Sequence, residues 1–170
     1  IGEWVAFLDD DDEWLPKKLE EQLASAPSAP AVLTTLSRVV KSGGEFVRPA
    51  YIYDAKQPID EWLFGRRSWW KGGESFLQTS SLMLPRALFN DLHFYEAPQH
   101  EEWELVIRAV KEFGYTLVTT PLPLVVFYID DSRPSLTKLS RWQVSMDWLN
   151  RMGNLITPTA YSGFCFTVAG

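Results

Sequence analysis

The stretch WVAFLDDDDEW, residues 4–14, guides the interpretation of the rest of the sequence. Five apolar residues run without a break into four consecutive aspartates, Asp9 to Asp12. A short continuous apolar run is typical of a strand that is buried on both faces of a parallel sheet. Ligands bind at the carboxyl ends of the strands in such sheets. The stretch therefore predicts an α/β fold with a negatively charged, oxygen-rich site at the end of this strand.

The four aspartates best match a hard divalent cation. Carboxylate oxygens suit Mg²⁺ or Mn²⁺, which in turn can hold a diphosphate. Other interpretations remain open, because most acidic runs are solvated loops and one aspartate could cap the helix that Pro16 starts. An EF-hand loop needs glycine where this sequence has Trp14. Phosphatases with an aspartyl nucleophile usually follow Asp-x-Asp with a small or β-branched residue, whereas Asp12 and Glu13 follow here.

The composition is that of a globular protein with one domain. Of the 170 residues, 46% are hydrophobic and 22% are charged. The formal net charge of −6 argues against nucleic acid as a partner, because binding phosphates requires a basic surface. The single cysteine, Cys165, excludes a disulfide framework and fits a reducing compartment. No stretch has the length of a transmembrane helix and the chain has no signal peptide, so we expect a cytoplasmic location.

The remaining sequence alternates between helices and strands. Residues 16–26 predict a helix with Leu19 and Leu23 turned inward and Lys18 among the outward residues. Residues 31–40 predict a strand that turns at 41–45 and returns, as an excursion at the edge of the sheet. Further strands are expected at residues 76–84, 115–119 and 122–128, and further helices at 58–64, 101–113 and 135–152, the last with Trp142, Met146 and Leu149 inward.

The helix at residues 101–113 has one unusual carboxylate. On a helical wheel, Glu101, Glu104 and Arg108 share the water-facing side, with Glu104 and Arg108 as an i,i+4 pair. Glu102 falls instead on the apolar side and faces the protein. Burying a carboxylate is costly unless something pairs with it, although a helix N-terminus favours negative charge. Glu102 is therefore either a structural cap or a working base.

Two segments resemble family 2 glycosyltransferases of the GT-A fold. FLDDDDEWLPKKL, residues 7–19, is similar to the family's segment in which a hydrophobic strand ends in Asp-x-Asp-Asp, followed by Trp, Pro and a Lys-Leu pair. HEEWEL, residues 100–105, followed by Arg108, is similar to the family's Glu-Asp-Trp-Asp-Leu and Arg, with Glu102 and Glu104 in place of Asp. The two motifs together, in this order, are more specific than either alone.

The resemblance implies a partial GT-A fold, in which helices flank a mixed sheet, over residues 1–170 as a single domain. The first half of the family's sequence, which supplies the opening strands and the nucleoside pocket, has no counterpart here. We therefore expect the chain to be the catalytic and acceptor half of such an enzyme, and we expect little activity from it alone.

The resemblance also implies roles for individual residues. Asp9 and Asp11 would bind Mn²⁺ or Mg²⁺ on the donor diphosphate, and Glu102 would be the general base. Polar side chains within the buried stretch 76–84 need partners, and the family's similar segment lies near the donor. Donor binding is thus expected at Asp9, Asp10, Asp11, Gln78, Thr79 and Arg133, and acceptor binding at Glu101 and Trp103. The loop at residues 65–73, with three cations and two tryptophans, could grip phosphate or sugar or could be an ordinary exposed loop.

The implied reaction transfers a sugar from a nucleotide diphosphosugar to an acceptor hydroxyl with inversion. The acceptor would be a bacterial surface glycan or its lipid-linked precursor, which is compatible with peripheral association at the inner face of the membrane. A decayed, non-catalytic relative that only binds metal or a partner remains an alternative, favoured by the change from Asp to Glu102. A nucleotidyltransferase, which uses a related fold and an acidic metal pair, is a second alternative that the inward Glu102 disfavours.

Overall fold

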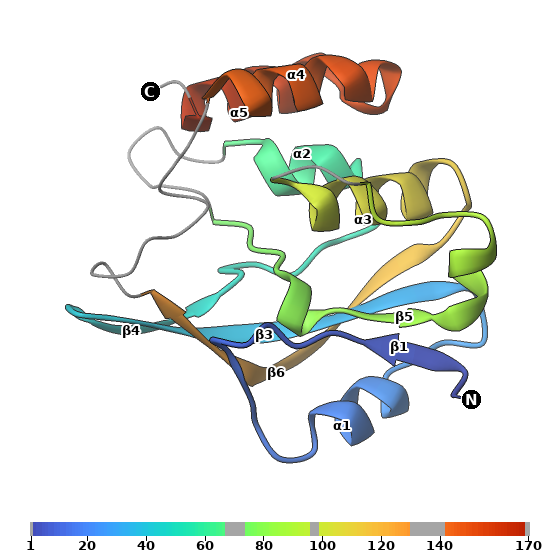
Figure 1. The fold of residues 1–170 in the computed structure, drawn as a ribbon, viewed down its shortest axis with the longest axis vertical. Helices are drawn as coiled ribbons and strands as arrows, with labels where there is room; N and C mark the ends of the chain where they lie inside the picture. Colours follow the sequence, from blue (N-terminus) through green and yellow to red (C-terminus); the bar gives the residue numbers. More distant parts are fainter. Residues whose placement is uncertain (1, 67–73, 96–98, 130–141, 169–170) are drawn as a thin grey trace.

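The centre of the fold is a mixed sheet (Figure 1). The structure is a computed structural model, and it describes residues 2–66, 74–95, 99–129 and 142–168. Among these residues six strands pair in the order β1-β5-β3-β6-β2, and β4 pairs with β3 off this path. The strands are β1 (Trp4–Ala6), β2 (Glu13–Trp14), β3 (Ala31–Lys41), β4 (Gly44–Arg48), β5 (Met83–Pro85) and β6 (Thr116–Ile129).

Helices cover both faces of this sheet, but unequally. Helix α1 lies alone on one face, whereas α2 and α3 cover the other and α4 and α5 form a further layer above them (Figure 1). The α-helices are α1 (Lys18–Ala24), α2 (Ile59–Phe64), α3 (Glu101–Lys111), α4 (Trp142–Met152) and α5 (Pro158–Val168), and the 3₁₀ helices are η1 (Thr79–Ser81), η2 (Arg86–Asn90) and η4 (Gly153–Leu155). None of the described helices is both long and apolar enough to span a membrane.

The main hydrophobic core includes residues of α2, α3, α4 and α5 together with residues of β3 and β6. Its aromatic side chains meet edge to face, with the Phe64 and Phe164 ring centroids 5.1 Å apart. Helix α5 crosses the end of α2 at Gly163, where a Cβ atom would come within 2.0 Å of the Phe64 carbonyl oxygen. Only glycine allows the two helices to approach this closely.

The predicted hairpin is confirmed, but its position in the sheet differs from the prediction. β3 and β4 pair up to Lys41 and Gly44. β3 is the central strand rather than an edge excursion, because it also pairs with β5 and, in parallel, with β6. The two strands expected at residues 115–119 and 122–128 form one strand, β6. Its prolines are accommodated by register shifts opposite Leu36, which pairs with Pro123.

The opening strand is shorter and less buried than predicted. Only Trp4–Ala6 forms β1, all three residues are partly buried, and the strand is antiparallel to β5 at one end of the strand order. The prediction of one strand over residues 76–84 is also wrong in part, because Thr79–Ser81 forms η1. The Ser81 hydroxyl donates to the Gln78 carbonyl at 2.6 Å, a local bond that competes with strand pairing.

The predicted orientation of α1 is wrong. Leu19 and Leu23 are 43% and 44% exposed, whereas Lys18 and Gln22 are 2% and 0% exposed. Leu19 and Leu23 are four residues apart, as expected for one face of a helix. Lys18 and Gln22 have the same spacing one residue earlier, so spacing alone does not show which pair is buried. The polar pair is buried because Lys18 Nζ donates to Gln22 Oε1 at 2.7 Å and so satisfies part of its own hydrogen-bonding capacity.

Helix α4 also differs in detail from the prediction. Leu149 is buried and Met146 is partly buried as expected, but Trp142 is 54% exposed. Trp148 takes the inward position instead, at 2% exposed. The described part of α4 begins at Trp142, so the expected first turns at residues 135–141 lie outside the described residues.

Candidate active site

The four aspartates form a turn between β1 and β2. The Asp12 N–H donates to the Asp9 carbonyl oxygen at 3.2 Å, which closes the turn. Asp9 and Asp12 are partly buried, and Asp10 and Asp11 are exposed. The apolar residues that precede the turn position it, since the Phe7 ring packs against Phe94 with centroids 5.2 Å apart. We call residues 9–12 the aspartate loop.

The segment from Gln78 to Ser81 holds the aspartate loop in place. Gln78 Nε2 donates to Asp9 Oδ2 at 3.3 Å and also to Asp12 Oδ2. The Asp9 N–H donates to Ser80 Oγ, and Trp14 Nε1 donates to the Ser80 carbonyl oxygen, each at 2.9 Å. The sequence predicted Gln78 as a donor-site residue but did not identify Asp12 or Ser80. The burial expected for the polar segment Gln78–Ser81 already indicated that its side chains need hydrogen-bond partners.

The aspartate loop concentrates negative charge. Burial raises the pKa of Asp9, and the carboxylates of Asp12, Asp11 and Glu101 raise it further, while a hydrogen bond to Ser80 opposes the shift. Burial also raises the pKa of Asp12, together with the charge of Asp11, against hydrogen bonds that include those to Ser80 and Gln78. A cation bound here would relieve this repulsion.

The aspartate loop and Gln78 each offer an oxygen atom that could bind a cation. Asp12 Oδ1 and Gln78 Oε1 are buried, and neither has a hydrogen-bond partner among the described residues. Within the described ranges, no group of three or more His, Cys, Asp and Glu side chains is arranged to hold a metal ion by itself. Mg²⁺ that also binds substrate phosphates takes only one or two protein carboxylates. The aspartate loop therefore fits a metal that is shared with a diphosphate.

The first turn of α3 brings Glu102 to this site. Burial raises the pKa of Glu102 to about 8, and the charges of Glu101 and Asp9 contribute to the shift. The carboxylates of Glu102 and Asp9 are therefore close enough to influence each other. Among the described residues no cation contributes to the shift, and a strongly perturbed carboxyl beside other acidic groups is typical of functional sites.

The residues beside Glu102 fix the start of α3. His100 adopts a left-handed backbone conformation with φ of 71°, and its ring stacks on Trp103 at 4.6 Å. Burial lowers the pKa of His100 to about 4, so the ring is neutral at pH 7, and its Nε2 is 2.8 Å from Ser145 Oγ. Trp103 Nε1 donates to the Leu77 carbonyl oxygen at 3.1 Å, which ties α3 to the residue before Gln78.

The prediction that Glu104 faces water is wrong. Glu104 is 3% exposed and accepts hydrogen bonds from Arg151 at 2.6 and 2.8 Å and from Trp148 Nε1 at 3.1 Å. Arg108 pairs with Glu112 instead, at 2.7 Å. The helical wheel failed here because α4 and η4 cover the side of α3 that the wheel assigns to water.

The structure brings most of the predicted site residues together. Asp9, Gln78 and Glu102 share one acidic site, with Asp10 and Asp11 on the exposed side of the aspartate loop. Thr79 begins η1 and is partly buried, but its side chain is not among the described contacts that hold the carboxylates. Arg133 and most of the loop at residues 65–73 lie outside the described residues.

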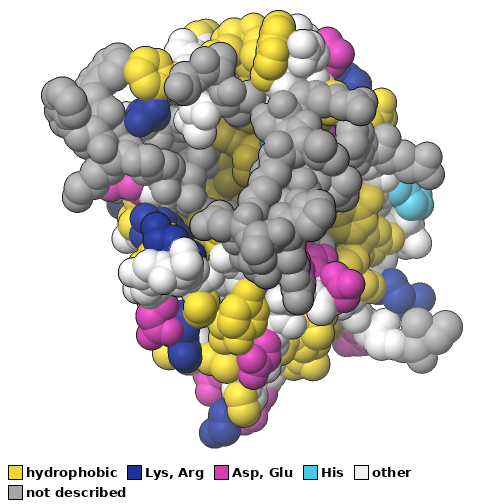
Figure 2. All heavy atoms as spheres, turned by 60° about the vertical axis from the view of Figure 1, so that its left-hand side comes forward, with side chains coloured by type: hydrophobic (Ala, Val, Ile, Leu, Met, Phe, Trp, Pro, Cys, Tyr) yellow, Lys and Arg dark blue, Asp and Glu magenta, His cyan; other side chains and the backbone are white. Residues whose placement is uncertain are grey.

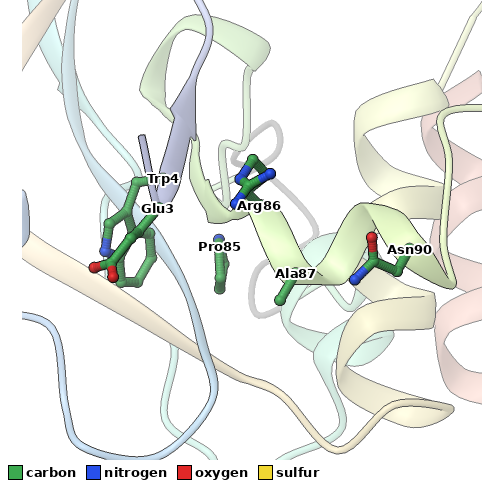
Figure 3. Close-up of a pocket in the computed structure, with 6 residues that line it drawn as sticks. All are labelled: Glu3, Trp4, Pro85, Arg86, Ala87 and Asn90. Carbon is green, nitrogen blue, oxygen red and sulfur yellow. The ribbon is translucent and has the colours of Figure 1, made fainter. Parts of the chain in front are cut away.

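A separate cavity lies at the other end of β1. Its volume is about 430 Å³, and Figure 3 shows the side chains that line it: Glu3, Trp4, Pro85, Arg86, Ala87 and Asn90. Because Trp4 begins β1 and Glu3 precedes it, this cavity is distinct from the aspartate loop, which follows the end of the strand. On the face shown in Figure 2, described acidic and basic side chains are interspersed with hydrophobic ones and form no continuous basic surface.

Comparison with known proteins identifies the family. Residues 1–92 match the family model described as "Glycosyl transferase family 2", which is more than half of the chain. The chain belongs to glycosyl transferase family 2. The matched residues of this family 2 chain include the aspartate loop and the segment Gln78–Ser81, and its mixed sheet flanked by helices is that of a partial GT-A fold, as the sequence predicted.

A curated relative extends beyond the family match. The chain is 28% identical over 159 residues to the amylovoran biosynthesis glycosyltransferase AmsB of Erwinia amylovora. The alignment covers 89% of this family 2 chain and 50% of the relative, so the chain spans about half the length of the curated relative it matches.

Proposed function

We propose that this chain carries the catalytic site of an enzyme that transfers a sugar from a nucleotide diphosphosugar to an acceptor hydroxyl with inversion. One observation carries the proposal: the carboxyl of Glu102, with its pKa raised to about 8, lies within the electrostatic influence of Asp9 in the aspartate loop. Family membership and the similarity to a glycosyltransferase support the reaction class.

On the donor side, the aspartate loop would bind the diphosphate of the nucleotide sugar. Asp9 and Asp11 would hold Mn²⁺ or Mg²⁺, which would offset the negative charge that develops on the departing nucleoside diphosphate. Gln78 already holds the carboxylates of Asp9 and Asp12 in position, so the loop needs little rearrangement to bind its ligand. Asp10, Thr79 and Arg133 remain candidates for further donor contacts.

On the acceptor side, Glu102 would take the proton from the attacking hydroxyl. With a pKa of about 8, most Glu102 carboxyls are protonated at pH 7 and cannot act as a base. Burial is the main cause of the raised pKa, and the charges of Glu101 and Asp9 add to it, so a cation in the aspartate loop would lower the pKa of Glu102 in part. A filled donor site would thus favour the ionised form of the base.

The acceptor is proposed to be a bacterial surface glycan or its lipid-linked precursor, handled at the inner face of the membrane. The name of the relative links that protein to the biosynthesis of amylovoran. Glu101 and Trp103 lie on either side of Glu102 in the sequence and remain the proposed acceptor contacts.

A donor panel tests the proposal. The protein, with any sequence that precedes residue 1 included because little activity is expected from residues 1–170 alone, is incubated with acceptor extract and a panel of nucleotide diphosphosugars. The nucleoside diphosphate that is released is measured with Mn²⁺, Mg²⁺ or a chelator. We expect release only with a divalent cation, and we expect Asp11→Ala to lower it at least ~100-fold. Glu45→Ala, an exposed carboxylate of the β3–β4 hairpin, is the matched control. Full release in chelator would contradict the metal role, and release of pyrophosphate would identify a nucleotidyltransferase instead.

A further inference from the structure

Helix α1 lies on the face of the sheet opposite α2 and α3 (Figure 1), and its first residue, Lys18, is buried. Lys18 is 2% exposed and Gln22 is 0% exposed, whereas Leu19 and Leu23 of the same helix point into solvent. Burying an ammonium group costs free energy that an aliphatic side chain would not cost. If α1 served only to cover the sheet, the leucines would be the buried pair, so the contacts of Lys18 need an explanation.

Lys18 has two partners. Its Nζ donates to Gln22 Oε1 at 2.7 Å and lies 4.3 Å from the centroid of the Trp14 ring. None of the ion pairs found among the described residues includes Lys18. Burial lowers the pKa of Lys18 to about 8, so at pH 7 most Lys18 side chains keep their positive charge.

The two partners of Lys18 hold consecutive carbonyl groups. Trp14 Nε1 donates to the Ser80 carbonyl oxygen at 2.9 Å, and Gln22 Nε2 donates to the Ser81 carbonyl oxygen at 3.0 Å. Both carbonyls belong to η1. Thr34 adds a third contact from β3, since its hydroxyl is 2.9 Å from Ser81 Oγ.

The same short segment holds the aspartate loop. Ser80 Oγ accepts from the Asp9 N–H, and Gln78, which precedes η1, donates to the carboxylates of Asp9 and Asp12. The segment therefore contacts the two partners of Lys18 on one side and the aspartate loop on the other. A shift of η1 would move the carboxylates with it.

The chemistry of an ammonium group explains why a lysine occupies this position. A side-chain amide can point either its oxygen or its nitrogen at a neighbour, but an ammonium group can only donate. Lys18 therefore holds Oε1 of Gln22, which leaves Nε2 to face the Ser81 carbonyl. The positive charge is also attracted to the face of the Trp14 ring, which orients Nε1 toward Ser80.

We propose that Lys18 is a positioning residue of the donor site: it orients Gln22 and Trp14, which hold η1 and thereby keep Gln78 and Ser80 on the aspartate loop. The inference rests on the proposed function in so far as the aspartate loop is the donor site. The contacts of Lys18 and η1 are independent of that function and can be measured without a substrate.

Three variants separate positioning from folding. Lys18→Met removes the ammonium group but fills its space. Gln22→Glu keeps an acceptor for Lys18 but removes the amide that donates to the Ser81 carbonyl. Lys17→Met makes the same change at the neighbouring exposed lysine and is the matched control. Hydrogen exchange of the Trp14 Nε1–H and the Asp9 N–H is measured by NMR, because both groups donate to Ser80, and urea denaturation gives the global stability.

We expect Lys18→Met and Gln22→Glu to speed exchange at both hydrogens about tenfold or more, while Lys17→Met leaves it unchanged. The urea midpoint of Lys18→Met should equal or exceed that of the wild type, so global unfolding would not explain the result. Where transfer activity is found, kcat should fall about tenfold in the first two variants. Unchanged exchange in the folded Gln22→Glu protein would overturn the proposal, even if Lys18→Met failed to fold. Absence of transfer in the wild type would count against the proposed function only.

Discussion

Glu102 and Glu104 lie two residues apart on α3, yet their surroundings are opposite. Glu104 is buried against a cation, since Arg151 donates two hydrogen bonds to it and Trp148 a third. Glu102 is placed among acidic groups, with its pKa raised to about 8 by burial and by neighbours that include Asp9. Glu104 therefore has a cationic partner, whereas no cation in the described part of the chain is paired with Glu102.

The difference separates a structural carboxylate from a functional one. The carboxylate of Glu104, held by Arg151 and Trp148, joins α3 to α4. A buried carboxylate without such partners lowers the stability of the fold, and such groups persist where chemistry requires them. Both residues occupy positions where the family motif has an acidic residue, so the motif alone does not distinguish their roles.

The largest effect is expected from Glu102→Gln, which keeps the size of the side chain but cannot accept a proton. Loss of a general base typically lowers the rate by ~10²–10⁴-fold. Glu112→Gln, at the C-terminal end of the same helix, is the control and should leave the rate unchanged. Steady-state transfer rates with the active donor decide the matter. Equal rates for the two variants would show that Glu102 is not the base.

A smaller effect, on stability rather than rate, is expected from Glu104→Ala. The change leaves Arg151 and the buried Trp148 indole without their acceptor, and hydrogen bonds to charged groups contribute about 1.5–3 kcal/mol each. Because Arg151 is 34% exposed and regains water, we expect a loss of about 2–3 kcal/mol in the free energy of unfolding.

The control for this prediction is Glu112→Ala, which breaks the exposed i,i+4 pair with Arg108 and should cost only about 0.5 kcal/mol. Urea denaturation at pH 7 measures both. If the two variants lost the same stability, the ion pair between α3 and α4 would not be structural.

A third effect is a pH dependence that distinguishes the wild type from Glu102→Gln. The pKa of Glu102 rises from 4.5 to about 8 on folding, so the folded state favours the protonated form. Below about pH 4.5 the group is protonated in both states and has no effect; as the pH rises toward 8 it destabilises the fold progressively. The stability of Glu102→Gln minus that of the wild type should therefore grow between these values by at most about 1.4 kcal/mol per pH unit.

Denaturation curves of both proteins at pH 5, 6, 7 and 8, in chelator, provide the measurement. A constant difference between the two proteins across this range would mean that Glu102 titrates normally. The Glu112→Gln protein again serves as the control, because it makes the same change at an exposed position at the C-terminal end of the same helix.

Local patterns in the sequence predicted the elements that have strong signals of their own. The β3–β4 hairpin follows from a β-branched run with a glycine turn, and α3 follows from its helical periodicity. Glu102 could be placed inward because its position on the wheel is unambiguous. The aspartate loop could be placed at the end of a strand because charge interrupts an apolar run.

Contacts between distant segments could not be read in this way. Glu104 turns inward because of Arg151, and the sequence of α3 contains no sign of that partner. The orientation of α1 depends on Trp14 and on the Ser81 carbonyl, so two leucines at helical spacing misled the prediction. Strand order could not be predicted either, because the sequence of β3 is that of a hairpin strand whether the strand lies at the edge or in the centre of the sheet.

The parallel pairing of β3 and β6 sets the order in which the protein can be completed during synthesis. The Pro30 carbonyl accepts from the backbone and the hydroxyl of Thr116, 86 residues later in the chain. Closing so long a loop slows folding, and the intervening chain includes both η1 and the first turn of α3. A ribosome-bound chain that ends before residue 116 therefore already contains the aspartate loop and Glu102 but lacks the strand that completes the sheet beneath them. Until β6 emerges, β3 is left with an unpaired edge, and this is the stage at which the nascent protein most needs protection from aggregation.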